Sequence, residues 1–206
     1  ILANKAATAR DLLGRLQLAY EHLPKWLQQG VMSWNKGSLE LENGSKILAS
    51  STSASAVRGG SYNIIFLDEF AYVPSNVAEQ FFSSVYPTIS SGQSTKVVIV
   101  STPNGMNLFY KLWSDAESGK NSYQPIEVHW SEIPGRDEKW KVETIANTSQ
   151  EPPVCSSFIT YQATPVIAPQ EQIIMTHRLC HSRMSFLLSL SLLLSLPPPP
   201  PPPPPP

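Results

Sequence analysis

The stretch from Asn63 to Phe70 constrains the fold of this chain more strongly than any other. Four apolar residues, 64–67, end abruptly in the adjacent carboxylates Asp68 and Glu69. A short apolar run of β-branched and aromatic residues is typical of a parallel strand that helices cover on both faces. Ligands of open parallel sheets bind beyond the carboxyl ends of the strands. We therefore expect both acids at a functional edge of such a sheet.

The two adjacent acids suit the hydrolysis of a nucleoside triphosphate. One carboxylate can hold Mg²⁺, directly or through water, because magnesium keeps most of its waters and takes one or two carboxylates plus phosphate oxygens. The neighbouring carboxylate can orient and deprotonate the attacking water. A strand that runs into a solvated turn or a helix cap has the same pattern, so the neighbouring segments have to decide.

The neighbouring segments alternate between strand and helix patterns, which predicts an α/β fold. Apolar residues at helical spacing predict a helix from its cap Thr8 to Leu23, a second helix from Ser75 that Pro87 closes, and a third at 108–116. We expect these helices to pack on the faces of a parallel sheet.

Further strands are predicted on both sides of the opening one. A buried β-branched run at 96–100 ends in the small polar residues Ser101 and Thr102, and another strand is expected at 126–130. Tight-turn signals between residues 31 and 51 predict a β-meander, and the small polar residues 50–62 are expected to form a loop beside the site.

Composition divides the 206 residues into two parts. Residues 1–150 are well mixed and hold every tryptophan and all but two of the acidic residues. Residues 151–206 pass through Leu-Ser alternation into ten prolines, and we expect a disordered or out-of-frame tail, because a CT repeat in DNA encodes Leu and Ser and a run of C encodes Pro.

The formal net charge of −1 gives no electrostatic case for nucleic acid. No apolar run is long enough to span a bilayer, so we expect a soluble protein with no membrane partner.

An ordered series of short segments carries a resemblance to a known family. The segments are Ile-Leu-Ala-Asn-Lys at 1–5, Trp-Asn-Lys-Gly-Ser at 34–38, Asn-Gly-Ser at 43–45, Ala-Val-Arg-Gly at 56–59, Phe-Leu-Asp-Glu at 66–69, Ile-Ser-Ser-Gly at 89–92 and Ser-Thr-Pro-Asn-Gly at 101–105. In this order they resemble the ATPase domain of the large terminase subunit of tailed bacteriophages, the motor that packages DNA into the capsid. The resemblance covers residues 1–147.

The resemblance implies roles for residues in two of these segments, and the position of Arg58 suggests a third contact. The strand that ends in Asp68 and Glu69 looks like a Walker B motif, which implies that Asp68 coordinates Mg²⁺ of an Mg²⁺–ATP complex and that Glu69 activates water. The segment with Ser101 and Thr102 is similar to the coupling motif, whose hydroxyls sense the γ-phosphate. Arg58 lies on a Gly-flanked loop from which it can reach phosphate or a neighbouring subunit, and a solvated loop charge is the alternative.

Two absences limit this interpretation. No Gly-x-x-x-x-Gly-Lys-Ser/Thr occurs in the chain, and the clustered acids of the family's nuclease domain are also missing. We therefore expect a partial P-loop NTPase-type sheet that begins inside a domain and is inactive alone. The resemblance implies double-stranded DNA, a portal protein and a small terminase subunit as partners, a homo-oligomeric ring and the bacterial host cytoplasm. A helicase-like P-loop ATPase and a degenerate or spurious fragment are the alternatives.

Overall fold

The computed structural model describes residues 1–53, 55–56, 60–91, 95–149 and 155–161. Their elements in chain order are β1 (Leu2–Ala3), α1 (Ala6–Glu21), η1 (Lys25–Leu27), β2 (Val31–Trp34), β3 (Ser38–Leu41), β4 (Lys46–Leu48), β5 (Ser50–Ser51), β6 (Ile64–Asp68), η2 (Phe70–Tyr72), α2 (Ser75–Ser91), β7 (Lys96–Ser101), α3 (Leu108–Glu117), β8 (Tyr123–Val128), η3 (Trp130–Glu132), α4 (Glu138–Thr148) and β9 (Cys155–Tyr161). The η elements are short 3₁₀ turns.

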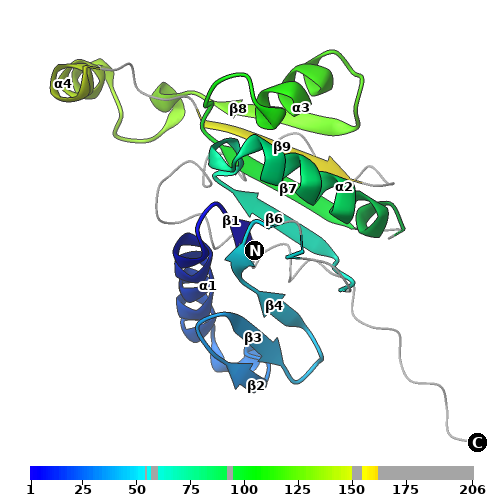
Figure 1. Cartoon of the computed structure of the whole chain (residues 1–206). Coiled ribbons are helices and arrows are strands. Elements are labelled where there is room, and N and C mark those ends of the chain that lie inside the picture. Colours follow the sequence, from blue (N-terminus) through cyan, green and yellow to red (C-terminus); the bar gives the residue numbers. More distant parts are fainter. Residues whose placement is uncertain (54, 57–59, 92–94, 150–154, 162–206) are drawn as a thin grey trace, which may run out of the picture.

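The described residues form a six-stranded sheet with the strand order β5-β1-β6-β7-β9-β8. Strands β5, β1, β6 and β7 run parallel, whereas β9 pairs antiparallel with both β7 and β8 (Figure 1). Helices flank the parallel strands, so the α/β prediction is confirmed.

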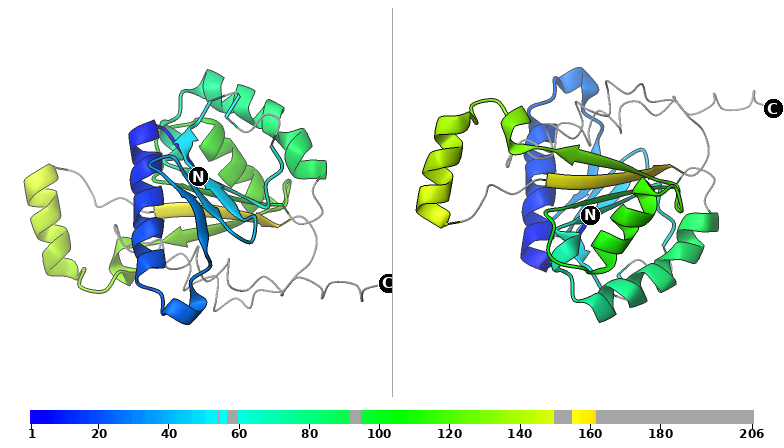
Figure 2. Two further views of the ribbon diagram at one scale, coloured as in Figure 1. Left: turned by 90° about the horizontal axis from the view of Figure 1, so that it is seen from below. Right: turned by 90° about the horizontal axis from the view of Figure 1, so that it is seen from above.

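Strands β6 and β7 lie at the centre of the strand order, and apolar residues cover both faces of this pair. On one face, Ile65 and Leu67 share a buried core with Val97 and Ile99 and with residues of α2 and α3. Figure 2 shows α2 and α3 together on this side of the sheet. On the other face, Phe66 packs against a second core formed by buried leucines of α1 and the meander. A continuous apolar run is what such a doubly covered strand requires.

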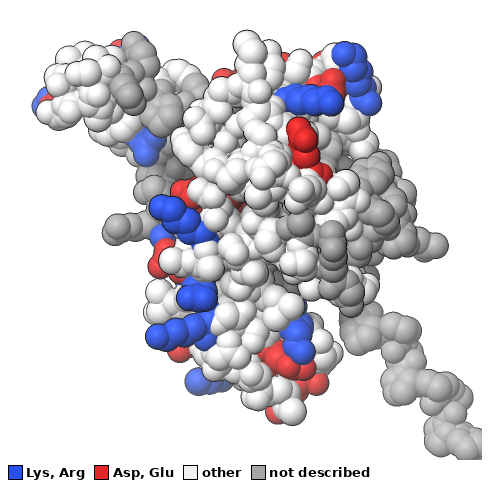
Figure 3. Space-filling view, viewed as in Figure 1, with Lys and Arg blue, Asp and Glu red and all other residues white. Residues whose placement is uncertain are grey.

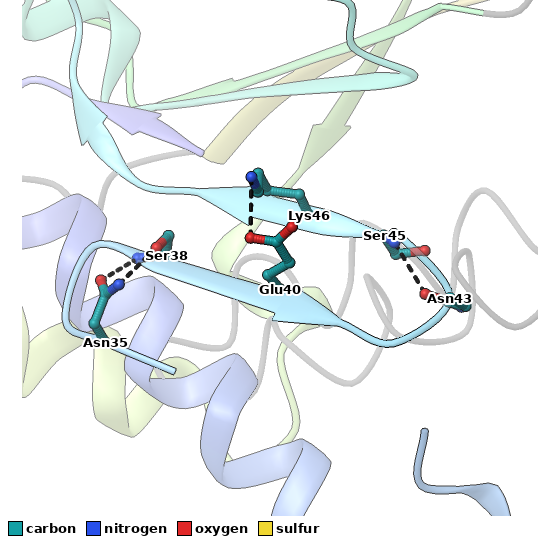
Figure 4. A network of polar contacts seen from close by, with 6 residues as sticks. All are labelled: Asn35, Ser38, Glu40, Asn43, Ser45 and Lys46. Atoms are coloured by element: carbon teal, nitrogen blue, oxygen red, sulfur yellow. Dashed lines mark hydrogen bonds and ion pairs between the residues drawn. The ribbon is translucent and has the colours of Figure 1, made fainter. Parts of the chain in front are cut away.

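The predicted β-meander is confirmed as a three-stranded antiparallel sheet, β2-β3-β4. At its first turn, the Asn35 side-chain oxygen accepts hydrogen bonds from the backbone of Gly37 and Ser38 at 2.9 and 2.8 Å. Its second turn contains Gly44 at φ 82°, a left-handed conformation that glycine adopts without steric cost. Glu40 of β3 and Lys46 of β4 lie opposite each other and form an ion pair of 3.0 Å (Figure 4).

Two predicted helix boundaries are wrong. Helix α1 begins at Ala6, with Lys5 rather than Thr8 at the N-cap, because the chain turns into the helix directly after the two-residue strand β1. Helix α2 continues past Pro87 to Ser91. A proline inside a helix removes one backbone hydrogen bond, and here the backbone of α2 remains helical on both sides of it.

The sheet also extends beyond what the sequence pattern indicated. Strand β8 begins at Tyr123, three residues before the predicted start, and ends at Val128. It contains Pro125, which fits its place at the edge of the sheet because a proline cannot donate a hydrogen bond to a neighbouring strand. Strand β9 lies past residue 150, where composition predicted the tail to begin. Its two adjacent apolar residues, Phe158 and Ile159, give no clean alternation from which a strand could be predicted.

Among the described residues, no helix is both long enough and apolar enough to cross a membrane.

The second core predicts different costs for two leucines of the same helix. Leu13 is fully buried beneath α1, whereas Leu18 is 55% exposed. We expect Leu13→Ala to lower the free energy of unfolding by about 2–5 kcal/mol, because it leaves a cavity in the core. Leu18→Ala changes helix propensity by the same amount and should cost less than about 1 kcal/mol. Urea unfolding followed by circular dichroism measures both, and equal losses would contradict the packing of α1 on the sheet.

Candidate active site

The carboxyl ends of β1, β6 and β7 meet at one edge of the sheet. Ala3 at the end of β1 pairs with Asp68 at the end of β6, and Leu67 pairs with Ile99 of the parallel strand β7. The chain therefore leaves β6 through Asp68 and Glu69 and leaves β7 through Ser101 and Thr102 at the same edge. This edge is where parallel sheets bind ligands.

Asp68 is partly buried, and its surroundings favour the neutral carboxyl. Burial, followed by the charge of the adjacent Glu69, raises the pKa of Asp68 from 3.8 to about 6. The backbone N–H of Glu69 donates to Oδ1 of Asp68 at 3.0 Å and, with the more distant charge of Arg15, lowers the pKa less than burial raises it. A cation bound next to Asp68 would therefore stabilise its ionised form.

Glu69 is exposed and adopts a left-handed backbone conformation, with φ 50° and ψ 35°. For a residue with a side chain this conformation costs about 1 kcal/mol or more, and it persists only where the surroundings hold it. It turns the chain sharply from β6 into η2, whose Phe70 and Ala71 are buried in the core beneath α2 and α3. Glu69 is thereby held at the edge of the sheet, with its side chain open to solvent.

Ser101 and Thr102 contact the turn that follows the acids, and within the described residues no hydrogen bond joins either hydroxyl to a carboxylate. Ser101 is buried, and its Oγ accepts from the Ala71 backbone N–H at 3.0 Å and donates to the Thr102 carbonyl at 3.1 Å. Thr102 Oγ1 lies 2.9 Å from the Tyr72 hydroxyl. Because strand residues alternate between faces, Ser101 lies on the face of Ile99 and Asp68 on the opposite face, that of Phe66.

Two asparagines complete this network, and neither was predicted as a site residue. Asn104 donates from Nδ2 to the Ala71 carbonyl at 3.3 Å, and Asn107 donates to the same carbonyl at 2.7 Å. Asn107 is also the N-cap of α3, since its Oδ1 accepts from the Tyr110 N–H at 3.2 Å. An asparagine directly before an amphipathic pattern is a known helix-start signal, but its second bond, to η2, depends on the tertiary fold.

Arg58, the remaining predicted site residue, lies outside the described residues. The loop in which it was expected begins with β5, and Thr52 follows at the same edge of the sheet. Thr52 is buried, and its N–H and hydroxyl both donate to the Ala3 carbonyl, at 2.8 and 3.2 Å. These bonds fix the start of the loop against β1.

The carboxylates at this edge suit a metal ion that is bound by protein carboxylates together with phosphate oxygens. Within the described part of the chain, no three His, Cys, Asp or Glu residues gather closely enough to form a metal cage of their own. Mg²⁺ does not require one, because it keeps several waters and takes one or two carboxylates together with substrate phosphate oxygens. Asp68 could be such a carboxylate, because burial and the charge of Glu69 disfavour its ionised form and a bound cation would offset both effects.

A groove of about 440 Å³ is lined by residues of α2 and α3 and by Asn107. Its lining includes Ser75 and Glu79 of α2 and Lys111 of α3, and neither Asp68 nor Glu69 contributes to it. This groove is therefore separate from the edge that carries the acids.

The charged side chains mark no nucleic-acid surface on the face drawn in Figure 3. Lys and Arg are interspersed with Asp and Glu on this face, and most of it is uncharged. This distribution agrees with the formal net charge of −1. DNA-binding surfaces usually show a basic stripe or patch, so the charge pattern here gives no argument for a DNA contact.

Comparison with known protein families places this chain beside a described family. The family model described as terminase large subunit, T4likevirus-type, N-terminal matches residues 4–157, well over half of the chain. The matched segment contains β6, β7 and both acids, and it continues past residue 150 into β9.

The raised pKa of Asp68 predicts a pH-dependent stability. Between about pH 4 and pH 6 the folded protein binds a proton that the unfolded chain has released. The free energy of unfolding therefore falls as the pH rises through this range. Asp68→Asn keeps the acceptor for the Glu69 N–H and removes the charge. We expect it to stabilise the protein at pH 7 by up to about 3 kcal/mol, reduced toward about 1 by solvent screening, and to have little effect at pH 4.

Urea unfolding at the two pH values measures this difference. Asp137→Asn is the matched control, because Asp137 also accepts a backbone N–H, from Trp140 at 2.8 Å, but is exposed at the start of α4. We expect no gain at pH 7 for the control. A stabilisation by Asp68→Asn that is equal at both pH values would show that the carboxylate is not destabilised by its surroundings.

Proposed function

Because this chain belongs to the T4-like terminase large subunit family, a family of DNA-packaging motors, and carries its N-terminal domain, we propose that it supplies the catalytic acids of a motor ATPase. The observation that carries this proposal is the parallel pairing of β6 with β7, which delivers two acids and two hydroxyls to one edge of the sheet. The substrate would be ATP with Mg²⁺, and the products ADP and phosphate.

In this proposal the two acids have different tasks. Asp68, partly buried and with a raised pKa, would hold Mg²⁺ directly or through water. When bound, the metal offsets the negative charge that develops on the phosphate oxygens. Glu69, exposed at the turn, would orient the attacking water and accept its proton. The left-handed backbone at Glu69 supports this division, because strained residues of this kind cluster at functional sites.

Ser101 and Thr102 would couple hydrolysis to movement. Their hydroxyls contact Ala71 and Tyr72, two and three residues after Glu69, so a change at the acids would be transmitted to the end of β7. We assign Ser101, which is buried and bonded to backbone on both sides, to this mechanical link. Thr102 is less buried and lies closer to solvent, where its hydroxyl can also reach a phosphate oxygen.

The proposed partners are inferred from the family match, because the surface of this domain gives no argument for them. We propose that the motor acts on double-stranded DNA in the cytoplasm of a bacterial host, as a homo-oligomeric ring with a portal protein and a small terminase subunit. Arg58 would contact phosphate or a neighbouring subunit. The 206 residues contain no phosphate-loop motif, so we propose that they bind and hydrolyse ATP poorly when expressed alone.

Binding of Mn²⁺, a paramagnetic substitute for Mg²⁺, tests the metal site without requiring turnover. We expect millimolar Mn²⁺ to broaden the backbone NMR signals of Asp68 and Glu69 before those of other acids. Asp68→Asn should weaken this effect on the order of tenfold, because hard cations bind according to the number of charged oxygen ligands. Asp137→Asn, far along the chain in α4, is the control and should leave it unchanged. Equal broadening at all exposed acids would argue against the site.

Phosphate release from ATP tests the activity of the chain alone. We expect a rate indistinguishable from that of Glu69→Gln, which keeps the shape of the side chain and removes the base. Turnover of about 1 s⁻¹ or more, in the range of ordinary enzymes, would contradict the proposed inactivity. If Glu69→Gln abolished that turnover, the role of Glu69 would stand and only the need for a phosphate loop would fall.

A further inference from the structure

The side chain of Asn107 joins three separate parts of the molecule. Its Nδ2 donates to the Ala71 carbonyl in η2 at 2.7 Å and to the Asn104 carbonyl in the loop after β7 at 3.0 Å. Its Oδ1 accepts from the Tyr110 N–H in the first turn of α3 at 3.2 Å. Both donor hydrogens and the acceptor of the amide are thereby used. An N-cap needs only the acceptor, so the bonds from Nδ2 exceed what helix capping requires.

The bond to Ala71 acts on the turn that sets the backbone of Glu69. The Tyr72 N–H donates to the Glu69 carbonyl at 2.9 Å, which closes the turn around Ala71. Ala71 is buried and is held on both sides, since its N–H donates to Ser101 Oγ and its carbonyl accepts from Asn107 Nδ2. The left-handed conformation of Glu69 opposes this arrangement by about 1 kcal/mol or more, so it depends on such bonds.

Helix α3 is a rigid support for this contact. Leu108, Leu112 and Trp113 pack against the core that contains Leu67, Phe70 and Ala71. Asn107 is therefore fixed at its helical end by packing and reaches η2 from there. A shift of α3 relative to the sheet would pull on the Ala71 carbonyl and, through the Tyr72 bond, on Glu69.

We propose that Asn107 is a positioning residue for Glu69, holding the turn after β6 so that the Glu69 carboxylate keeps its place at the edge of the sheet. This inference rests on the proposed function only in giving Glu69 a catalytic role. It extends that function by assigning the connection between the acids and α3 to one side chain outside the matched Ser-Thr-Pro-Asn-Gly segment.

Two substitutions separate positioning from capping. Asn107→Asp keeps the acceptor for Tyr110, because aspartate caps helices as well as asparagine does, but it cannot donate to Ala71 when ionised. Asn107→Ala loses both functions. Asp137→Ala removes the cap of α4 and controls for the general effect of losing a cap far from the acids.

The measurement is amide hydrogen exchange by NMR on the full chain, together with the backbone HN–Hα coupling of Glu69. In Asn107→Asp we expect exchange of the Tyr72 amide to rise tenfold or more and the Glu69 coupling to leave its left-handed value, while the Lys111 amide in α3 stays protected. In Asn107→Ala we expect both regions to exchange faster. Asp137→Ala should leave Tyr72 and Glu69 unchanged.

The outcomes distinguish this inference from the proposed function. Tyr72 exchange within twofold of the parent and an unchanged Glu69 coupling in Asn107→Asp would overturn the positioning role, even if Mn²⁺ still broadens Asp68. Absence of Mn²⁺ broadening in the parent chain would overturn the metal site and leave the exchange result standing. If Asn107→Ala fails to fold, Asn107→Asp alone decides, because its cap is preserved.

Discussion

The parallel pairing of β6 with β7 places the polar groups of the candidate site at one edge of the sheet. Both strands are apolar because cores lie on both faces of the sheet, and their pairing aligns Leu67 with Ile99. Since parallel strands end at the same edge of the sheet, the polar residues that directly follow them lie close together. The acids after β6 and the hydroxyls after β7 are neighbours for this reason.

Strain at the end of β6 gives this edge its particular geometry. Glu69 is left-handed, and the turn that follows is held by hydrogen bonds from β7 and from the cap of α3. The same bonds make the acids sensitive to the position of α3. In the proposed function this link would connect hydrolysis to movement, through a few side-chain contacts to one buried residue, Ala71.

The sequence predicted the elements of the fold well and their ends less well. The apolar runs at β6 and β7 and the helical spacing of α3 were sufficient because burial imposes those patterns directly. The helix boundaries predicted at Thr8 and Pro87 are wrong, because local propensities are weak and the tertiary context overrides them. Strand β9 was missed, since its order of residues does not alternate and its place depends on the free edge of β7.

Two carboxylates after a buried strand, and small hydroxyl residues after a second one, can be inferred from the sequence because chemical types and apolar runs are local properties. The contacts that these groups make follow only from the folded arrangement of the chain. It put Asp68 and Ser101 on opposite faces, gave Glu69 its left-handed backbone and brought Asn107 to Ala71, 36 residues earlier in the chain. Contacts of this kind depend on how strands pair and helices pack, and no local pattern of residues encodes them.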